Sequence, residues 1–368
     1  MEVMRSAAAR AAAGADVVHL EVGQPGTRAP SGVITAAHRA LDDDVLGYTV
    51  ALGDDTLRHS IAGHYRDWYD VSVDADRIVV TQGSSGAFVL TFLAAFAPGS
   101  RVAIPAPGYA AYRNMLVALD IEPVIIEVGA GAEYVLTPDH LASAGHLDGA
   151  IIASPNNPTG TMLDEDQLMD LASWCDHNGV TLVSDEIYHG ITFGNRAHTA
   201  IDLPGQPIVV NSFSKYFSMT GWRLGWVILP ADLLTPVERL AQNLTIAPPT
   251  LAQIAARAAF DCHDELRRNV ALYEEHRSQL LSALTDLGFL QLAPADGAFY
   301  VWSDVSHLTD DSQVLCRTWL DELGVATTPG LDFDPNHGHR FIRFSYAGTT
   351  RDITEAIDRI ATWLDVQR

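Results

Sequence analysis

Lys215 is the only lysine in the chain, although the sequence contains 22 arginines. Lysine and arginine both supply positive charge, but only the primary amine of lysine can lose its proton and form a Schiff base with a carbonyl. Lys215 ends the segment Asn211-Ser212-Phe213-Ser214-Lys215, which directly follows an apolar run, and Arg223 lies eight residues further on. An amine beside hydroxyls and a guanidinium at the end of a strand indicates a Schiff-base site with an adjacent phosphate anchor.

Two further segments place polar side chains directly after apolar runs. Residues 81–86 read Thr-Gln-Gly-Ser-Ser-Gly, with Ser84 and Ser85 at the predicted start of a helix. Amides and hydroxyls at a helix N-terminus bind anions, although serine and glycine are also ordinary capping residues. Asp185 ends another apolar run, and Tyr188 follows three residues later. A carboxylate there is costly to bury without a partner, so this segment indicates either a paired acid or a helix cap.

Two loop segments allow either a structural or a binding role. Residues 154–160 read Ser-Pro-Asn-Asn-Pro-Thr-Gly and include Asn157, and this composition is typical of turns. Residues 105–112 read Pro-Ala-Pro-Gly-Tyr-Ala-Ala-Tyr and present Tyr109 either as an aromatic face or as part of a packed corner. We expect His189, a single histidine in a predicted loop, to be solvated or to cap a helix.

Seven short apolar runs alternate with longer helical patterns, and each run is bounded by glycine, proline, serine or asparagine. The runs are 77–81, 101–105, 123–128, 150–154, 181–185, 208–212 and 224–229. This alternation implies crossover connections, so we predict an α/β fold with a mostly parallel seven-stranded sheet between helices. Ligands bind outside the carboxyl ends of parallel strands, so the polar segments above should meet at one site.

The pattern changes after residue 229, where a long helical stretch precedes a second, smaller α/β unit. The predicted elements of this part are a helical stretch at 250–287, strands at 298–302 and 341–345, and a closing helix at 351–366. We predict that the small domain combines the C-terminal part with the N-terminal segment. The predicted division is a large cofactor-binding domain of residues 40–272 and a small domain of residues 1–39 and 273–368.

Composition limits the classes of function. The 368 residues carry a formal net charge of −23, and such a field repels nucleic acid and anionic membranes. No apolar run is as long as a membrane span, and charges interrupt the alanine-rich start, unlike the core of a signal peptide. Cys175, Cys262 and Cys316 are far apart, which predicts reduced thiols instead of a disulfide framework or a metal site. We therefore expect a cytoplasmic protein without nucleic-acid, membrane or metal partners.

Together these segments resemble the class I/II aminotransferases, which are pyridoxal-phosphate enzymes of fold type I in the aspartate aminotransferase superfamily. The matching motifs are SFSKxxxxxGWRxG at 212–225, NNPTG at 156–160, DEIY at 185–188, PxPxYxxY at 105–112 and RFSYA at 343–347. The resemblance extends from Val22-Gly23-Gln24-Pro25 to Arg343, and the single lysine falls at the family's cofactor lysine.

The resemblance implies roles around the cofactor ring. Lys215 would hold pyridoxal phosphate as an internal aldimine and, once displaced by the substrate amine, would act as the proton-transfer base. Asp185 would pair with the pyridine nitrogen and keep it protonated, which makes the ring an electron sink. Tyr188 and Asn157 would hydrogen-bond the 3′ oxygen of the ring, and Tyr109 would stack on the ring face.

The resemblance also implies how the cofactor phosphate is held. Ser84 and Ser85 at the helix start, Ser212 and Arg223 would bind the phosphate. Tyr48 resembles the tyrosine that reaches across a homodimer to the partner's phosphate. Ser214, beside the lysine, ranks below these residues.

Substrate binding follows from the same resemblance. Arg343 would bind the substrate α-carboxylate bidentately, with Asn157 and the backbone at Gly23 alongside. Two departures from the family affect this region. The chain begins close to the Val-Gly-Gln-Pro loop, so we expect the covering segment seen in relatives to be short. Many relatives have Pro-Gly-x-x-Phe-Gly where this chain has Pro-Gly-Leu-Asp-Phe-Asp at 329–334, which should reshape the loop before Arg343.

The predicted function is transfer of an α-amino group from an amino acid to a 2-oxo acid through a pyridoxal phosphate/pyridoxamine phosphate cycle. Two alternatives remain open on the sequence: a C–S β-lyase that uses the same cofactor, and a non-catalytic cofactor-binding regulatory module. A dicarboxylate substrate would need a second cation, for which Arg28 and Arg113 are the candidates. Aromatic residues near the predicted entrance, Tyr112 and Trp222, permit aromatic or aliphatic donors, and 2-oxoglutarate is the family-level acceptor.

Overall fold

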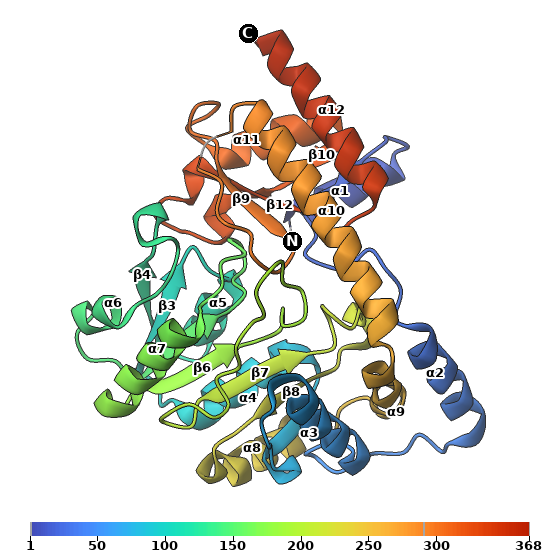
Figure 1. The fold of residues 1–368 in the computed structure, drawn as a ribbon, viewed down its shortest axis with the longest axis vertical. Helices are drawn as coiled ribbons and strands as arrows, with labels where there is room; N and C mark the ends of the chain where they lie inside the picture. Colours follow the sequence, from blue (N-terminus) through green and yellow to red (C-terminus); the bar gives the residue numbers. More distant parts are fainter. Residues whose placement is uncertain (1, 290, 368) are drawn as a thin grey trace.

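A computed structural model describes residues 2–289 and 291–367 and contains the predicted seven-stranded sheet (Figure 1). Its order is β2-β8-β7-β6-β5-β3-β4, and only β8 runs antiparallel to its neighbours. The strands are β2 (Ile78–Thr81), β3 (Arg101–Ala106), β4 (Glu122–Glu127), β5 (Gly149–Ala153), β6 (Thr181–Asp185), β7 (Ile208–Ser212) and β8 (Gly225–Ile228). Each strand lies at one of the seven apolar runs, so this prediction is confirmed.

Alternate residues of the large sheet pack against helices on opposite faces, as the two-residue repeat of a strand requires. On one face the strands meet α4 (Gly83–Ala95), α5 (Ala110–Ala118) and α8 (Ala231–Leu244). On the other face they meet α3 (Asp55–Tyr69), α6 (Pro138–Ser143) and α7 (Glu165–Asn178). Covered faces on both sides explain why the strands read as continuous apolar runs.

Two small sheets form a second unit above the large sheet in Figure 1. One has the antiparallel order β11-β12-β9, and the other pairs β1 with β10 in parallel. The strands are β1 (Val18–His19), β9 (Tyr300–Asp304), β10 (Val325–Ala326), β11 (Thr328–Pro329) and β12 (Phe341–Ser345). The helices of this unit are α1 (Glu2–Ala12), α11 (Ser312–Thr318) and α12 (Thr350–Gln367). The β1–β10 pair joins the N-terminal segment to the C-terminal part, as predicted.

The helical stretch predicted at 250–287 is not continuous. It consists of α9 (Thr250–Ala256), a 3₁₀ turn at Arg257–Asp261 and α10 (His263–Asp286). Cys262 has non-helical backbone angles, and acidic residues follow it in the first turn of α10, where they favour a new helix N-terminus. α10 then runs along the molecule from α9 to the second unit (Figure 1). Among the remaining helices, α2 (Ser31–Asp43) packs on α9.

The strand predicted at 298–302 begins two residues later, at Tyr300. Ala298 has a φ of +59°, a left-handed conformation that a strand residue cannot adopt. The turn around Gly297 and Ala298 instead carries the chain towards Ile191, whose carbonyl accepts a hydrogen bond from the Ala298 amide at 2.9 Å.

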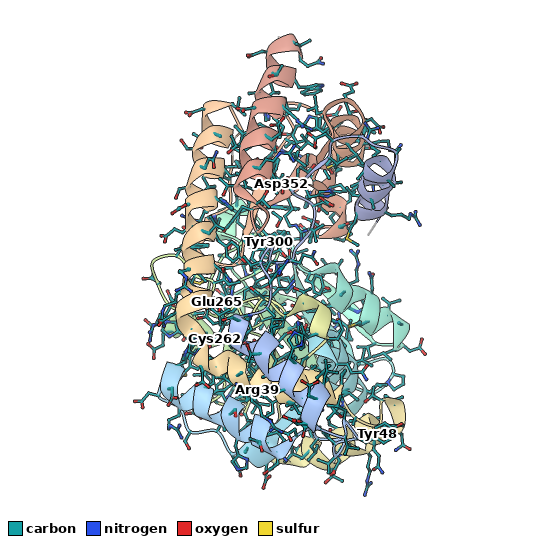
Figure 2. All side chains as sticks on the ribbon, turned by 90° about the vertical axis from the view of Figure 1, so that its right-hand side faces the viewer. Arg39, Tyr48, Cys262, Glu265, Tyr300 and Asp352 are labelled. Carbon is teal, nitrogen blue, oxygen red and sulfur yellow. The ribbon has the colours of Figure 1, made fainter. Side chains whose placement is uncertain are left out.

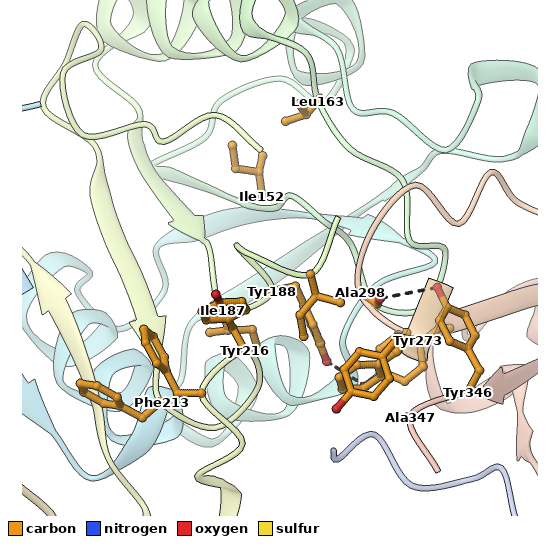
Figure 3. Close-up of a cluster of buried hydrophobic side chains, with 14 of the residues drawn as sticks. Ile152, Leu163, Ile187, Tyr188, Phe213, Tyr216, Tyr273, Ala298, Tyr346 and Ala347 are labelled. Carbon is orange, nitrogen blue, oxygen red and sulfur yellow. Dashed lines mark hydrogen bonds between the residues drawn. The ribbon is translucent and has the colours of Figure 1, made fainter. Parts of the chain in front are cut away.

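One hydrophobic cluster continues from the large sheet into the second unit, as Figure 3 shows. Tyr188 and Phe213 come from the loops of the large sheet, whereas Tyr273 and Tyr346 come from α10 and from the segment after β12. This shared core holds the two units against each other around the strand ends. Within the described ranges, no helix combines the length and apolar character needed to cross a membrane.

Candidate active site

A cavity of about 570 Å³ lies at the carboxyl ends of the large-sheet strands, between the sheet and the second unit. Its wall contains ten of the twelve predicted site residues. These are Gly23, Ser84, Ser85, Tyr109, Asn157, Asp185, Tyr188, Lys215, Arg223 and Arg343. The loops after β2, β3, β5, β6 and β7 supply the large-sheet members, as the geometry of parallel strands predicts.

Lys215 lies in the loop after β7, and its Nζ donates a hydrogen bond to the carbonyl oxygen of Gly23. Burial lowers the pKa of the amine from 10.5 to about 8. The positive charge of Arg343 contributes to this lowering, and the carboxylate of Asp185 opposes it. An amine with this pKa supplies a useful neutral fraction near pH 7, which a nucleophile requires.

Asp185 is buried at the end of β6, and two donors hold its carboxylate. The hydroxyl of Tyr112 donates to Oδ2, and the amide of Ile187 donates to Oδ1 at 3.1 Å. Burial raises the pKa of Asp185 to about 6, while these donors and the charge of Lys215 lower it. The sequence assigned Tyr112 to the entrance, but the structure buries it against Asp185. Tyr112 lies one helical turn after Tyr109, and that spacing is the signal for its inward position.

Arg343 is a buried cation held between two aromatic rings. Its guanidinium carbon lies 4.2 Å from the ring centre of Tyr300 and 4.6 Å from that of Phe333. Nη1 donates to Oδ1 of Asn157 at 2.9 Å, and Nη2 donates to the carbonyl oxygen of Glu21 at 2.8 Å. Nε has no partner, and no carboxylate of the described residues lies within ion-pair distance. A buried guanidinium of this kind is suited to receive a carboxylate from a ligand.

The opposite end of the cavity has the features of a phosphate site. Ser84 and Ser85 lie in the first turn of α4, whose free amides favour anions. Arg223 extends beside them, with its Nη1 donating to the carbonyl of Thr220 at 3.1 Å. Gly83 has a φ of +71°, and a Cβ at this position would lie 2.6 Å from Nη2 of Arg223. Glycine at 83 therefore leaves the space that the guanidinium occupies.

Ser212 is the first of the two predicted residues that the cavity wall lacks. It is buried at the end of β7, and its Oγ lies 2.8 Å from Oγ of Ser214 and 3.1 Å from the carbonyl of Leu224. Ser214, which the sequence ranked lower, lines the cavity instead. The Ser212 hydroxyl therefore reaches the cavity through that of Ser214.

Tyr48 is the second predicted residue outside the cavity. Its side chain is 83% exposed, and Figure 2 shows it at the surface, far from Tyr300. The flanking backbone is anchored to α9: the hydroxyl of Thr250 donates to the carbonyl of Gly47 at 2.6 Å. The Tyr48 side chain therefore extends into solvent from a backbone segment that is fixed to α9.

Tyr300 is a site residue that the sequence did not indicate, because it lies inside an apolar strand pattern. Its hydroxyl lies 2.8 Å from that of Tyr188, and its ring packs on the guanidinium of Arg343. A Cβ on Gly23 would lie only 2.1 Å from the Tyr300 hydroxyl, so glycine is required there. Tyr300 thus connects the carboxylate-binding end of the cavity to Tyr188.

His189 is buried behind Asp185, contrary to the expectation that it is solvated or caps a helix. Its Nδ1 lies 2.7 Å from the hydroxyl of Tyr69, and its Nε2 lies 2.9 Å from the carbonyl of Ser154. Glu186 is adjacent, with a carboxylate oxygen 3.5 Å from the histidine ring. Burial raises the pKa of Glu186 to about 8 and lowers that of His189 to about 3. The pair supports the loop that carries Asp185.

The cavity is lined in part by the N-terminal helix and by the loop before β12. Val3 and Met4 of α1 line it, so this helix supplies cover where the sequence predicted only a short leading segment. Arg113 and Asp332 also line it, with opposite charges. Arg28, the other candidate cation for a dicarboxylate, lines a separate open cavity of about 540 Å³.

These residues meet the chemical requirements of pyridoxal phosphate. Lys215 offers an amine for the aldehyde, and Asp185 offers a buried carboxylate for a ring nitrogen. The space over Gly83 holds a guanidinium beside a helix N-terminus, which suits the phosphate. Arg343 adds a buried guanidinium to the same cavity, and no carboxylate among the described residues is paired with it, which suits a substrate carboxylate.

Known proteins support this assignment. The family model described as "Aminotransferase class I and II" matches residues 15–360. The "Valine--pyruvate aminotransferase" of Mycobacterium tuberculosis is 46% identical, with 100% of this chain and 96% of the relative covered. An "Aspartate aminotransferase" of Sulfurisphaera tokodaii is 30% identical, with 96% of this chain and 91% of the relative covered.

Solved structures give the same result. An aminotransferase from Mycobacterium tuberculosis superposes with a TM-score of 0.97 at 46% identity, covering 100% of this chain and 96% of that one. The Thermus thermophilus aspartate aminotransferase with maleate gives a TM-score of 0.93 at 30% identity, covering 98% and 95%. This chain therefore belongs to the class I and II aminotransferases and is a transaminase that uses pyridoxal phosphate.

Proposed function

We propose that this transaminase takes the α-amino group from an amino acid with an uncharged, valine-like side chain and transfers it to a small 2-oxo acid such as pyruvate. The observation that carries the amino-acid part is Arg343, a buried cation without an anion beside the Lys215 amine. The apolar residues Val3, Leu331 and Phe333 in the cavity wall support the valine-like side chain. The name of the Mycobacterium tuberculosis relative, "Valine--pyruvate aminotransferase", agrees with this donor and acceptor.

The cofactor, when bound, supplies a carbonyl that condenses with amines and a ring that withdraws electrons from the substrate α-carbon. Lys215 holds the cofactor between turnovers and then moves the proton at its Nζ to and from the substrate. Asp185 would keep a proton on the ring nitrogen of the bound cofactor. Tyr188 and Asn157 would donate hydrogen bonds to the ring oxygen of the cofactor, and Tyr109 would cover the ring face. All five line the one cavity, which supports these roles.

The proposed phosphate site consists of Ser84, Ser85 and Arg223, with Ser212 acting through the hydroxyl of Ser214. The helix N-terminus and the 2.8 Å contact between the hydroxyls of Ser212 and Ser214 support this grouping. The Arg343 guanidinium binds the substrate α-carboxylate, with Asn157 fixing its Nη1 and the carbonyl of Gly23 lying beside Lys215.

We further propose a homodimer in which Tyr48 reaches the partner's phosphate site. Tyr48 is exposed on an anchored segment, and the neighbouring Val45 and Val50 are exposed as well. Exposed apolar side chains on one segment favour a protein interface. The domain division proposed from the sequence, 40–272 against 1–39 with 273–368, agrees with the separation of the sheets, although its end residues 1 and 368 lie outside the described ranges.

A cytoplasmic location remains part of the proposal. Cys175, Cys262 and Cys316 are all free thiols, and free thiols suit a reducing compartment.

The test is the absorbance spectrum of the purified protein with cofactor, mixed with each of the twenty amino acids in turn. The expected result with valine is conversion of the Schiff-base band to the pyridoxamine band, reversed by pyruvate. Release of ammonia and a 2-oxo acid without the pyridoxamine band would instead indicate a lyase. Lys215→Arg is the matched control, because it keeps the charge but removes the reactive amine.

A further inference from the structure

The loop of residues 330–338, before β12, supplies one of the two aromatic rings that hold Arg343. Residues 331–333 line the cavity. The ring centre of Phe333 lies 4.6 Å from the guanidinium carbon of Arg343. The two ends of the loop pack so closely that a Cβ on Gly330 would meet the carbonyl oxygen of Gly338. This loop is therefore a compact structure whose middle part reaches the substrate-binding arginine.

Asp334 closes the loop with its side chain, which is buried at 4% exposed. Its Oδ1 accepts hydrogen bonds from the amides of Asn336 at 2.9 Å and His337 at 3.0 Å. Its own amide donates to the carbonyl of Gly330 at 2.9 Å, and its carbonyl accepts from the amide of Gly338 at 3.0 Å. Glycine, which many relatives have at this position, has no side-chain acceptor. The reshaping expected from the sequence is thus a turn that the Asp334 side chain holds closed.

Phe333 directly precedes Asp334 and is fixed by contacts on two further sides. Its carbonyl accepts a hydrogen bond from the amide of Gly108 at 3.1 Å, so the loop is joined to the segment that carries Tyr109. Its ring meets the ring of Trp302 edge to face, with the centres 5.8 Å apart. The Phe333 ring is therefore held between Trp302 and the Arg343 guanidinium.

Contacts on the outer side of the loop contribute less to its position. Asn336 Nδ2 donates to Oε1 of Glu127 at 2.8 Å, and His337 Nε2 lies 3.3 Å from Oε2 of Glu127. The side chains of His337 and Glu127 are both 54% exposed, and exposed ion pairs contribute little to stability. Hydrogen bonds from amides to a buried carboxylate contribute more, so Asp334 is the main fixed point of the loop.

We propose that Asp334 is a positioning residue for substrate binding, which fixes Phe333 against Arg343 and thereby orients the guanidinium that receives the α-carboxylate. The inference rests on the carboxylate role of Arg343 in the proposed function. A guanidinium held between two rings loses less freedom when a carboxylate binds it, and its planar geometry is already set. Without the Asp334 acceptor the turn and the ring would be released, whereas Arg343 would keep its charge.

The experiment measures how tightly the cofactor-loaded enzyme binds 3-methylbutanoate, an unreactive monocarboxylate, from the change in cofactor absorbance. Asp334→Gly should weaken binding about tenfold, and so should Phe333→Leu, because both changes remove a fixed ring from the guanidinium. Acetate, which has no side chain, should lose the same factor, because the change acts on the carboxylate. Asp334→Asn keeps an acceptor oxygen and should stay within about twofold of wild type. Cofactor affinity, measured by equilibrium dialysis, should not change in these variants.

Asp311→Gly is the matched control. Oδ1 of Asp311 also accepts from two amides, those of Gln313 at 2.9 Å and Val314 at 3.3 Å, but this side chain caps α11 and lies outside the cavity wall. Loss of that cap should leave carboxylate binding unchanged. In the Phe333→Leu background, adding Asp334→Gly should change the affinity less than about twofold, because both changes act through the same ring.

Wild-type carboxylate affinity in Asp334→Gly or in Phe333→Leu would overturn the inference. So would a loss confined to 3-methylbutanoate, a loss of the same size in Asp311→Gly, or a full further loss when Asp334→Gly is added to Phe333→Leu. An unchanged affinity in Phe333→Leu decides against the inference even if Asp334→Gly does not fold. Failure of the proposed function is distinct: no amino acid would then convert the cofactor, whatever the carboxylate affinities.

Discussion

The pKa of Lys215 gives the most direct test of the site, because the chain has one lysine. Burial and the charge of Arg343 lower this pKa from 10.5 to about 8. At pH 7 a pKa of 8 leaves about one amine in ten neutral, against about one in 3,000 for an ordinary lysine. The neutral fraction is therefore about 300-fold larger, and the amine should react at neutral pH.

The perturbation is Arg343→Met, which removes a positive charge that lowers the pKa of Lys215. Without that charge, protonation of Lys215 becomes easier, so its pKa should rise. Asp185→Asn should have the opposite effect, because the carboxylate favours the protonated amine. Arg340→Met is the matched control, since Arg340 pairs with Asp304 on the second unit.

The assay is reductive methylation of the cofactor-free protein across a pH series, read by mass spectrometry of the peptide that contains Lys215. The N-terminal amine, with an ordinary pKa near 7.7–8.0, serves as the internal standard. The wild-type midpoint should lie near pH 8 and should move upward in Arg343→Met only. A wild-type midpoint near 10.5, or equal midpoints in Arg343→Met and Arg340→Met, would refute the electrostatic reasoning.

Three further predictions concern other parts of the site. Gly83→Ala should weaken cofactor binding roughly tenfold, because the added Cβ would meet the Arg223 guanidinium and because the backbone of residue 83 is left-handed. Equilibrium dialysis measures the cofactor affinity, and an unchanged affinity would argue against the phosphate site. Tyr48→Phe should weaken cofactor binding about tenfold by removing one phosphate donor, with an unchanged dimer mass in sedimentation as the control. Glu186→Gln should flatten the pH dependence of stability. The folded pKa of Glu186 is raised to about 8, so its stabilising contribution is present below about pH 4.5 and is lost as pH rises to 8. Urea unfolding at pH 5 and pH 8 measures this, and parallel losses in wild type and variant would contradict it.

The sequence predicted the large sheet well because its strands are buried on both faces. Such strands read as short apolar runs between turn residues, and all seven runs became strands. The elements that the sequence missed are those set by tertiary contacts. The strands β1, β10 and β11 have two residues each, which is too short for any repeat. The start of β9 depends on the left-handed backbone of Ala298, which no local signal reveals.

The site residues also divide into those that local sequence motifs predict and those that only tertiary contacts define. Lys215, Asp185 and Arg223 stand in ordered motifs after strands, so the sequence brought them to one cavity. Tyr300 and Glu21 lie in the second unit and its N-terminal segment, and only the fold brings the Tyr300 hydroxyl to Tyr188 and the Glu21 carbonyl to Arg343. The sequence ranked Ser212 above Ser214, but Ser214 lines the cavity, because side-chain direction at a strand end decides which serine faces it.

The single lysine has a consequence for proteolysis. An endoprotease specific for lysine has one cleavage site in the chain, after Lys215, in a loop whose flanking residues are buried between β7 and β8. Cleavage there requires this loop to open, so its rate reports local unfolding at the active site instead of fraying elsewhere. A Schiff base on the same amine would block the free lysine side chain that the protease recognises. Cleavage would give two fragments, 1–215 and 216–368. Their rate of appearance would therefore measure how often the cofactor-free loop opens, and the protected fraction would measure cofactor occupancy.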